Sequence, residues 1–234
     1  MENPIRPPEQ ILNPQTLFLR NLPASYRADG RTVRAKPLPD RLFISGELLE
    51  NDMHPVAIIG SRDVTIEGRN FAFQLGAGLA LQGRTVVSGL ALGSDTAALQ
   101  GTLSKAGRAI AVLPGPLDDI RPKTNLSTAR VISQMGALLS EYPSGTPYHK
   151  RLYIERNRLI VAMCSHLVIV EAKKGGGTHQ AAQLAYAAGV PVSVFYNEDN
   201  QTETAYLQQA ARVLDSNMLS PVYSVTEVLH AVST

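Results

Sequence analysis

The sequence has few of the features that mark secreted, membrane-spanning or redox-active proteins. Its 234 residues include one cysteine, Cys164, and no tryptophan, and 18% of them are charged. A single cysteine cannot form an internal disulfide, and within the apolar run 159–164 it is expected to be a small buried side chain. No apolar run is long enough to cross a bilayer, and the polar, proline-rich residues 1–10 do not resemble a signal peptide. We therefore expect a cytoplasmic protein that is not associated with a membrane.

Strong charge of either sign is also missing. The formal net charge is +2, so a binding site for a polyanion would have to come from local clustering of Lys and Arg. The histidines lack the spacing of metal ligands; they are His54, His149, His166, His179 and His230. No metal site is expected.

The first part of the chain is rich in proline. Prolines recur through residues 1–40 and break any long helix, so that only residues 15–22 are expected to be ordered there. Lys and Arg outnumber Asp and Glu in the same stretch. We expect an irregular basic arm over residues 1–40, either a solvated tether or part of a grip on a polyanion, followed by one domain over residues 41–234.

The remaining chain alternates apolar runs with helical patterns, which is typical of βαβ units and a parallel sheet. The predicted strands are 56–59, 85–87, 109–113, 137–139, 166–170 and 191–195, with a short edge strand at 42–45. The predicted helices are 67–82, 94–106, 124–135, 152–163 and 178–188, with a further amphipathic helix at 201–214. Right-handed crossovers place the carboxyl ends of the parallel strands on one edge of the sheet, where ligands of such folds bind.

Several loops on that edge carry groups suited to phosphate. Gly60, Ser61 and Arg62 combine a turn glycine, a hydroxyl and a guanidinium that can take two phosphate oxygens. Ser88 and Gly89 follow the second strand, where a glycine permits close backbone approach. These five residues are predicted to face an anion.

Hydrogen-bond donors and aromatic rings follow the third and fourth strands. Lys123 and Asn125 come after the third strand, and Lys150 precedes Tyr153 after the fourth. Cations for the backbone and flat rings for the bases are what a single-stranded nucleic acid requires. The alternative is an ordinary surface loop whose rings pack on a neighbour.

Two further elements complete the candidate site. Arg156 and Asn157 lie in the first turns of a mostly buried helix, where cations oppose the helix dipole and need a carboxylate or a bound anion. The glycine-rich loop before the next predicted helix can wrap phosphate oxygens with N–H groups; it consists of Lys174, Gly175, Gly176, Gly177 and Thr178. Asp95 is expected to cap a helix or brace a loop, and no residue is assigned a catalytic role.

The order of these motifs resembles the DNA-processing protein A (DprA/Smf) family. The motifs are Gly60-Ser61-Arg62, Val87-Ser88-Gly89-Leu90-Ala91, Gly93-Ser94-Asp95, Ala111-Val112-Leu113, Leu117-Asp118, Ser140-Glu141-Tyr142-Pro143, Gly145-Thr146-Pro147, Arg156-Asn157-Arg158 and Val170-Glu171-Ala172. The resemblance covers residues 41–232. It implies an extended Rossmann-like domain, doubly wound, with a mostly parallel sheet and helices on both faces. It also implies binding of single-stranded DNA without a cofactor, loading of a RecA-type recombinase during natural transformation, and a homodimer.

The glycine loop departs from the pattern of that family and leans toward the cytokinin-activating phosphoribohydrolases (the LOG family). An alternative function is therefore a module that binds a nucleotide or a phosphorylated small molecule. A phosphoribohydrolase is a third possibility, although no glutamate lies between Thr178 and Val190 to serve as the catalytic carboxylate of that family. The residues that the first resemblance assigns to the DNA pocket are Arg62, Lys123, Lys150, Tyr153 and the loop near Gly175.

Overall fold

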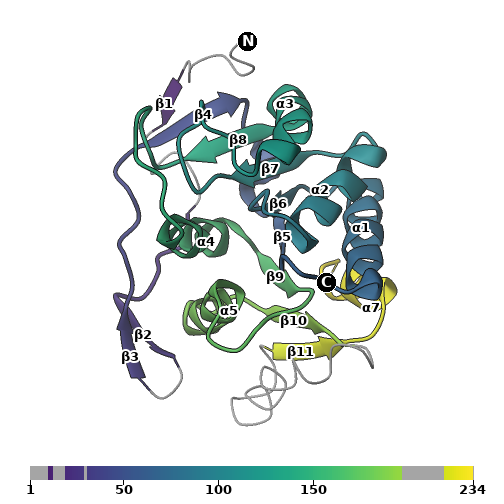
Figure 1. The fold of residues 1–234 in the computed structure, drawn as a ribbon. Helices are drawn as coiled ribbons and strands as arrows, with labels where there is room; N and C mark the ends of the chain where they lie inside the picture. Colours follow the sequence, from purple (N-terminus) through teal and green to yellow (C-terminus); the bar gives the residue numbers. More distant parts are fainter. Residues whose placement is uncertain (1–9, 13–18, 29–30, 197–218, 234) are drawn as a thin grey trace.

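We analysed a computed structural model, which describes residues 10–12, 19–28, 31–196 and 219–233. Within these residues the chain forms one large, mostly parallel β-sheet covered by helices on both faces (Figure 1). This confirms the predicted Rossmann-like fold class. The helix predicted at 201–214 and the first half of the ordered segment predicted at 15–22 lie outside the described residues.

The described part of the sheet has nine strands in the order β1-β4-β8-β7-β6-β5-β9-β10-β11. Only the pairs β1–β4 and β4–β8 are antiparallel. The strands are β1 Gln10–Leu12, β4 Leu42–Gly46, β5 Val56–Ile59, β6 Val86–Ser88, β7 Ala109–Val112, β8 Ala137–Ser140, β9 His166–Ile169, β10 Val192–Phe195 and β11 Leu219–Val222. All six apolar runs predicted as parallel strands are therefore strands, and no end differs by more than one residue.

Alternate residues of each central strand pack against different helices. Ala57 and Ile59 of β5 belong to the cluster beneath α4 (Arg151–Met163) and α5 (Gly177–Ala187). Val56 and Ile58 face the other layer, which includes α1 and α2. The helices of that layer are α1 Ile66–Leu81, α2 Ser94–Ser104, α3 Leu126–Met135 and α7 Val225–Ala231. Burial on both faces explains why these strands are continuously apolar in sequence.

Two expectations about the start of the chain are wrong. β4 is not an edge strand, because β1 pairs with it on its outer side. Residues 1–40 are not irregular throughout either, because β2 (Ser25–Ala28) and β3 (Arg31–Arg34) form an antiparallel hairpin that lies beside α5 (Figure 1). No proline lies within β1, β2 or β3, so every residue of these three strands keeps a backbone N–H group for pairing.

The order in which the chain adds strands to the sheet reverses at β5. From β5 the chain proceeds through β6, β7 and β8 on one side, and α4 then carries it back to β9 on the other side of β5. Ligands of open α/β sheets bind at such a switch point, outside the carboxyl ends of the strands. Among the described residues, no helix combines the length and apolarity needed to cross a membrane.

The single cysteine packs as expected. Cys164 follows α4 and is buried, with its thiol directed at the carbonyl of Val161, 3.7 Å away. Burial raises the pKa of this thiol to about 12. It is therefore a small core side chain in its protonated form near neutral pH.

Candidate functional site

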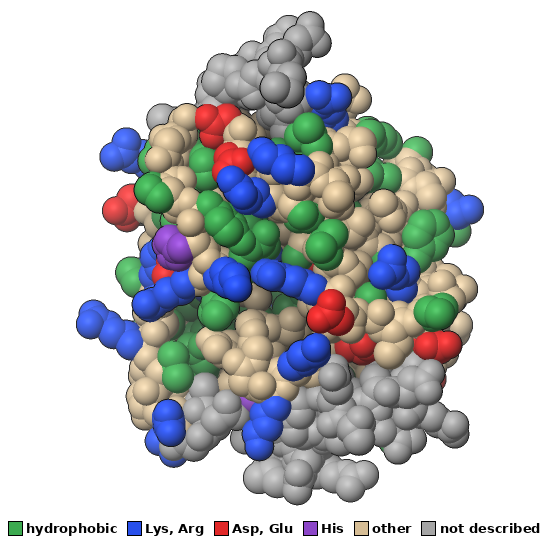
Figure 2. All heavy atoms as spheres, viewed as in Figure 1, with side chains coloured by type: hydrophobic (Ala, Val, Ile, Leu, Met, Phe, Trp, Pro, Cys, Tyr) green, Lys and Arg blue, Asp and Glu red, His purple; other side chains and the backbone are tan. Residues whose placement is uncertain are grey.

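A hollow of about 330 Å³ lies at the switch point between the loops that follow β5 and β9 and the start of α4. Ten of the sixteen sequence-predicted residues line it; they are Gly60, Ser61, Arg62, Lys150, Tyr153, Arg156, Asn157, Gly176, Gly177 and Thr178. The structure therefore brings together the turn after β5, the first turns of α4 and the glycine loop. Figure 2 shows Lys and Arg side chains forming a row across the middle of the same face of the molecule.

The turn after β5 is shaped by close contact with α2. A side chain at Gly60 would collide with Ser94, whose hydroxyl donates to the carbonyl of Ser61 at 3.2 Å. The hydroxyl of Thr178, at the start of α5, donates to the carbonyl of Gly60 at 3.1 Å. These contacts fix the backbone from which Arg62 extends into solvent.

Arg62 and Tyr153 form the exposed wall of the hollow. The Arg62 guanidinium lies over the Tyr153 ring, 4.1 Å from its centroid, as in a cation–π pair. The Tyr148 ring meets Tyr153 edge-on at 5.9 Å, and Arg121 lies over Tyr148 at 4.8 Å. Burial and the hydrogen bond with Tyr148 raise the pKa of Tyr153 to about 12, so its ring is uncharged at neutral pH. The arrangement alternates cations with flat rings.

Helical spacing explains which side chains of α4 face the hollow. Lys150, Tyr153, Ile154 and Asn157 recur at intervals of three and four residues and therefore share one face of the helix. The Asn157 amide donates to the carbonyl of Gly177 at 3.3 Å, which ties α4 to the glycine loop. The sequence prediction did not include Ile154, although it lies four residues after Lys150 and therefore on the same face of the helix.

Arg156 reaches beneath the hollow and is almost completely buried. Its guanidinium donates to the carbonyls of Gly89 and Val112 and lies 3.9 Å from the carboxylate of Asp95. Burial lowers the pKa of Arg156 and raises that of Asp95, each against the attraction between them. Asp95 also accepts a hydrogen bond from the amide of Ala91, so it braces a loop as expected. The guanidinium occupies the space that a side chain at Gly89 would need.

The glycine loop supplies backbone and one lysine. Gly175 has φ +73°, a conformation that favours glycine, and its amide donates to Nδ1 of His179 at 2.8 Å. Gly176 precedes the first turn of α5, and the N–H groups of such a turn attract anions. Lys173 lines the hollow and pairs with Asp63 at 3.5 Å. The sequence prediction named the adjacent Lys174 instead. A loop has no regular spacing of side chains, so the sequence does not show which of two neighbouring lysines points into the hollow.

Six predicted residues do not line the hollow: Ser88, Gly89, Lys123, Asn125, Lys174 and Gly175. Ser88 is buried and donates to the carbonyl of Ile58, and Asn125 is buried and donates to the carbonyl of Leu90 at 2.9 Å. Both therefore hold the scaffold. Lys123 is exposed and pairs with Asp119 at 2.8 Å.

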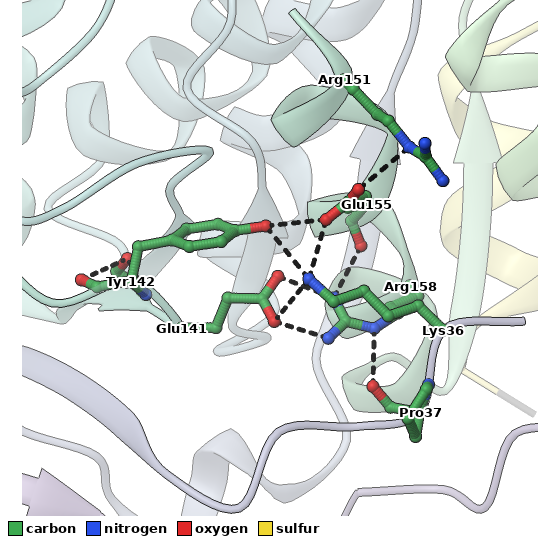
Figure 3. Close-up of polar contacts among 8 residues, drawn as sticks. Lys36, Pro37, Glu141, Tyr142, Arg151, Glu155 and Arg158 are labelled. Atoms are coloured by element: carbon green, nitrogen blue, oxygen red, sulfur yellow. Dashed lines mark hydrogen bonds and ion pairs between the residues drawn. The ribbon is translucent and has the colours of Figure 1, made fainter. Parts of the chain in front are cut away.

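Arg158 has a carboxylate partner, Glu141. It forms two hydrogen bonds to Glu141, of 2.8 and 2.6 Å, and both side chains are buried (Figure 3). Burial alone would raise the pKa of Glu141, but the hydrogen bonds and charge of Arg158 outweigh it and the pKa lies below its ordinary value. Lys36 and Glu155 extend the network, with an ion pair of 2.7 Å. This network joins the N-terminal segment to α4.

No cluster of three His, Cys, Asp or Glu side chains that could hold a metal ion occurs in the described part of the chain. The carboxylates of the hollow are Asp63, which is exposed, and Asp95, which is buried. The cations are Arg62, Lys150, Arg156 and Lys173. The hollow is therefore cationic on balance, with backbone donors on one side and an aromatic ring on the other, and its chemistry suits a phosphate ester attached to a flat group.

Fold and site together define a Rossmann-like α/β protein with a cationic, ring-lined crevice at its switch point. The sequence profile of the DNA recombination-mediator protein A family matches residues 23–230, and the chain belongs to this family. It is 35% identical over 165 residues to the putative DNA processing protein DprA of Mycobacterium tuberculosis, a match that covers 68% of this chain and 42% of the relative. It is 34% identical over 151 residues to the DNA processing protein DprA of Streptococcus pneumoniae, covering 64% and 53%. The chain spans about half the length of these curated relatives.

Solved structures give the same assignment. DNA processing protein A of Helicobacter pylori, described for its single-stranded DNA binding mode, matches with a TM-score of 0.73 and 28% identity, over 85% of this chain and 88% of that one. DprA of Streptococcus pneumoniae matches with a TM-score of 0.73 and 30% identity, over 82% and 66%. The molybdenum cofactor binding protein of Rippkaea orientalis shares the fold alone, at a TM-score of 0.58 and 19% identity, over 77% and 98%.

Proposed function

We propose that the chain binds single-stranded DNA in the hollow at the switch point and acts as a recombination mediator. The observation that carries this proposal is the Arg62 guanidinium, 4.1 Å from the centroid of the Tyr153 ring, beside Lys150 in a hollow of about 330 Å³. A cation next to a flat ring fits the repeating unit of a nucleic acid, in which a phosphate alternates with a base.

The geometry favours a single strand. A base would stack on Tyr153 in place of the Arg62 guanidinium, which would then turn toward a phosphate. Such stacking requires that the face of the base is free, which a paired and stacked duplex does not allow. Arg62 and Lys150 would then neutralise phosphates, and the first N–H groups of α5 beyond Gly176 would bind another phosphate oxygen. Affinity should depend steeply on salt, because neutralised phosphates release counterions.

The proposed role is binding without catalysis. Asp95 braces the loop at Ala91 from a buried position next to Arg156, and Asp63 is exposed and paired with Lys173. Both carboxylates of the hollow are thus engaged in holding the protein's own groups. In the recombination role the protein partner would be a RecA-type recombinase, and the family resemblance adds a homodimer.

A second candidate is a module for a nucleotide or a phosphorylated small molecule. The start of α5 favours it, because Gly176, Gly177 and Thr178 line the hollow together and could bind a terminal phosphate. The volume of the hollow is within the range of small-ligand sites. The two candidates differ in whether neighbouring nucleotides contribute to affinity.

Fluorescence anisotropy with labelled oligo-dT, unlabelled duplex and a panel of mononucleotides tests both candidates. We expect binding of the single strand that weakens with salt, weak competition by duplex, and weaker competition by mononucleotides. Tight stoichiometric binding of one mononucleotide that oligo-dT cannot displace would support the second candidate and contradict the first.

A further inference from the structure

A second hollow, of about 270 Å³, lies next to the first and is formed by the N-terminal hairpin. The β2–β3 hairpin packs against α5, and side chains of the hairpin, α4 and α5 line a space that opens to solvent. Ile154 and Asn157 line both hollows. The two sites are therefore contiguous across one face of α4.

The inner surface of the second hollow is suited to a flat, partly apolar group. Tyr26 of β2 and Val33 of β3 face each other in the hairpin register and are partly buried. Ile154 and Leu184 contribute apolar surface from α4 and α5, and the Gln180 amide lies at the same wall. An aromatic ring, aliphatic side chains and an amide are the groups that proteins use around an unstacked base.

The rim of the second hollow is cationic. Lys36 and Arg151 share the carboxylate of Glu155, at 2.7 and 3.1 Å, and Arg158 is neutralised by Glu141. Arg34 is exposed and makes no ion pair with any of the described residues. Figure 2 shows further Lys and Arg side chains at the lower left, where Figure 1 places the hairpin.

We propose that this second hollow is another nucleotide subsite for the same DNA strand, with a base against Tyr26 and its phosphate at Arg34 and Arg151. The inference rests on the proposed function, because the strand reaches this subsite from the first hollow over Ile154 and Asn157. It gives the N-terminal hairpin a part in binding. Under this proposal β2 and β3 belong to the grip on a polyanion, which is one of the two roles expected for the N-terminal arm.

The Arg34→Glu variant tests the subsite. Arg34 is exposed and unpaired within the described structure, so its reversal leaves the fold intact while it repels a phosphate. With an oligo-dT of about 16 nucleotides, long enough to cross both hollows, we expect affinity to fall about tenfold and the salt dependence to become shallower. The matched control is Arg130→Glu, the same charge change at an exposed residue of α3, which lines neither hollow and packs on the other face of the sheet from α4 and α5.

Photocrosslinking gives a second, independent measurement on the unmutated protein. A strand carrying 5-iododeoxyuridine at each position in turn should crosslink to the peptide that contains Tyr26 from some positions and to the one that contains Tyr153 from others. Crosslinks at Tyr153 alone would overturn the subsite.

The failure of this inference can be distinguished from failure of the proposed function. If Arg62→Ala weakens binding of oligo-dT and Arg34→Glu does not, the hairpin subsite is wrong and the first hollow stands. If the unmutated protein does not bind oligo-dT at all, both proposals are wrong.

Discussion

Replacing Arg62 by alanine is the most direct test of the binding site. The side chain is exposed and lies over the Tyr153 ring, and it has no ion-pair partner within the described residues. Loss of the cation–π contact at an exposed site should cost the fold less than about 1 kcal/mol. Loss of a charged hydrogen bond to phosphate should cost binding about 1.5–3 kcal/mol, which is a factor of about 10–150 in Kd. Binding should therefore suffer more than stability.

The assay is anisotropy with labelled oligo-dT at several salt concentrations, with thermal unfolding measured on the same samples. We expect the Arg62→Ala protein to show a slope of log K against log salt that is shallower by about 0.7, the value for one phosphate of a single strand. Arg62→Lys should be intermediate, because it keeps the charge but loses the planar fork that stacks on Tyr153. Arg130→Ala, on α3, is the control for loss of one positive charge. An unchanged Kd and slope in a fully folded Arg62→Ala protein would refute the assignment of Arg62 as a phosphate ligand.

Two further predictions concern the scaffold of the site. Gly60→Ala should destabilise the protein by about 1–3 kcal/mol in thermal or urea unfolding, because the new methyl group would collide with Ser94; Gly115→Ala, where nothing lies within 4 Å, is the control and should be near neutral. Equal effects of the two substitutions would contradict the packing argument. Glu141 has a folded pKa below its ordinary value, so its contribution is present above the unfolded pKa of about 4.3 and is lost as pH falls through the folded pKa. Glu141→Gln leaves the buried Arg158 without its charge partner and should lower the free energy of unfolding at pH 7 by about 3 kcal/mol. In urea unfolding, the variant should also lose less stability than the unmutated protein as the pH falls below about 5. Parallel pH profiles would show that the pair does not stabilise the fold.

The strands of the sheet could be predicted from the sequence, because strands that are buried on both faces consist of consecutive apolar residues. Strands such as β5 and β7 are continuous apolar runs between helical patterns, and each predicted strand end lies within one residue of the observed one. The hairpin β2–β3 carries no such signal. Its strands are short, half exposed and rich in arginine, and their register depends on packing against α5 that lies more than a hundred residues away in the chain.

The site was predictable where a residue's direction follows from its secondary structure. Lys150, Tyr153 and Asn157 share one face of a helix, so one correct member implies the others. Loop residues lack such a rule. Lys123 follows the third strand as expected, yet Asp119 binds its ammonium group, and that partner is visible only in three dimensions.

Arg156 and Arg158 show why a cationic motif alone does not define a binding surface. Both lie on α4 and both are buried. Arg156 binds the carbonyls of Gly89, directly after β6, and of Val112, the last residue of β7, whereas Arg158 binds Glu141. Because desolvated cations need fixed partners, these two arginines hold loops in place and leave the exposed Arg62 and Lys150 to meet a ligand. It follows that charge reversal at an exposed cation should change affinity with little effect on folding. The same reversal at a buried one should unfold the switch point before binding can be measured.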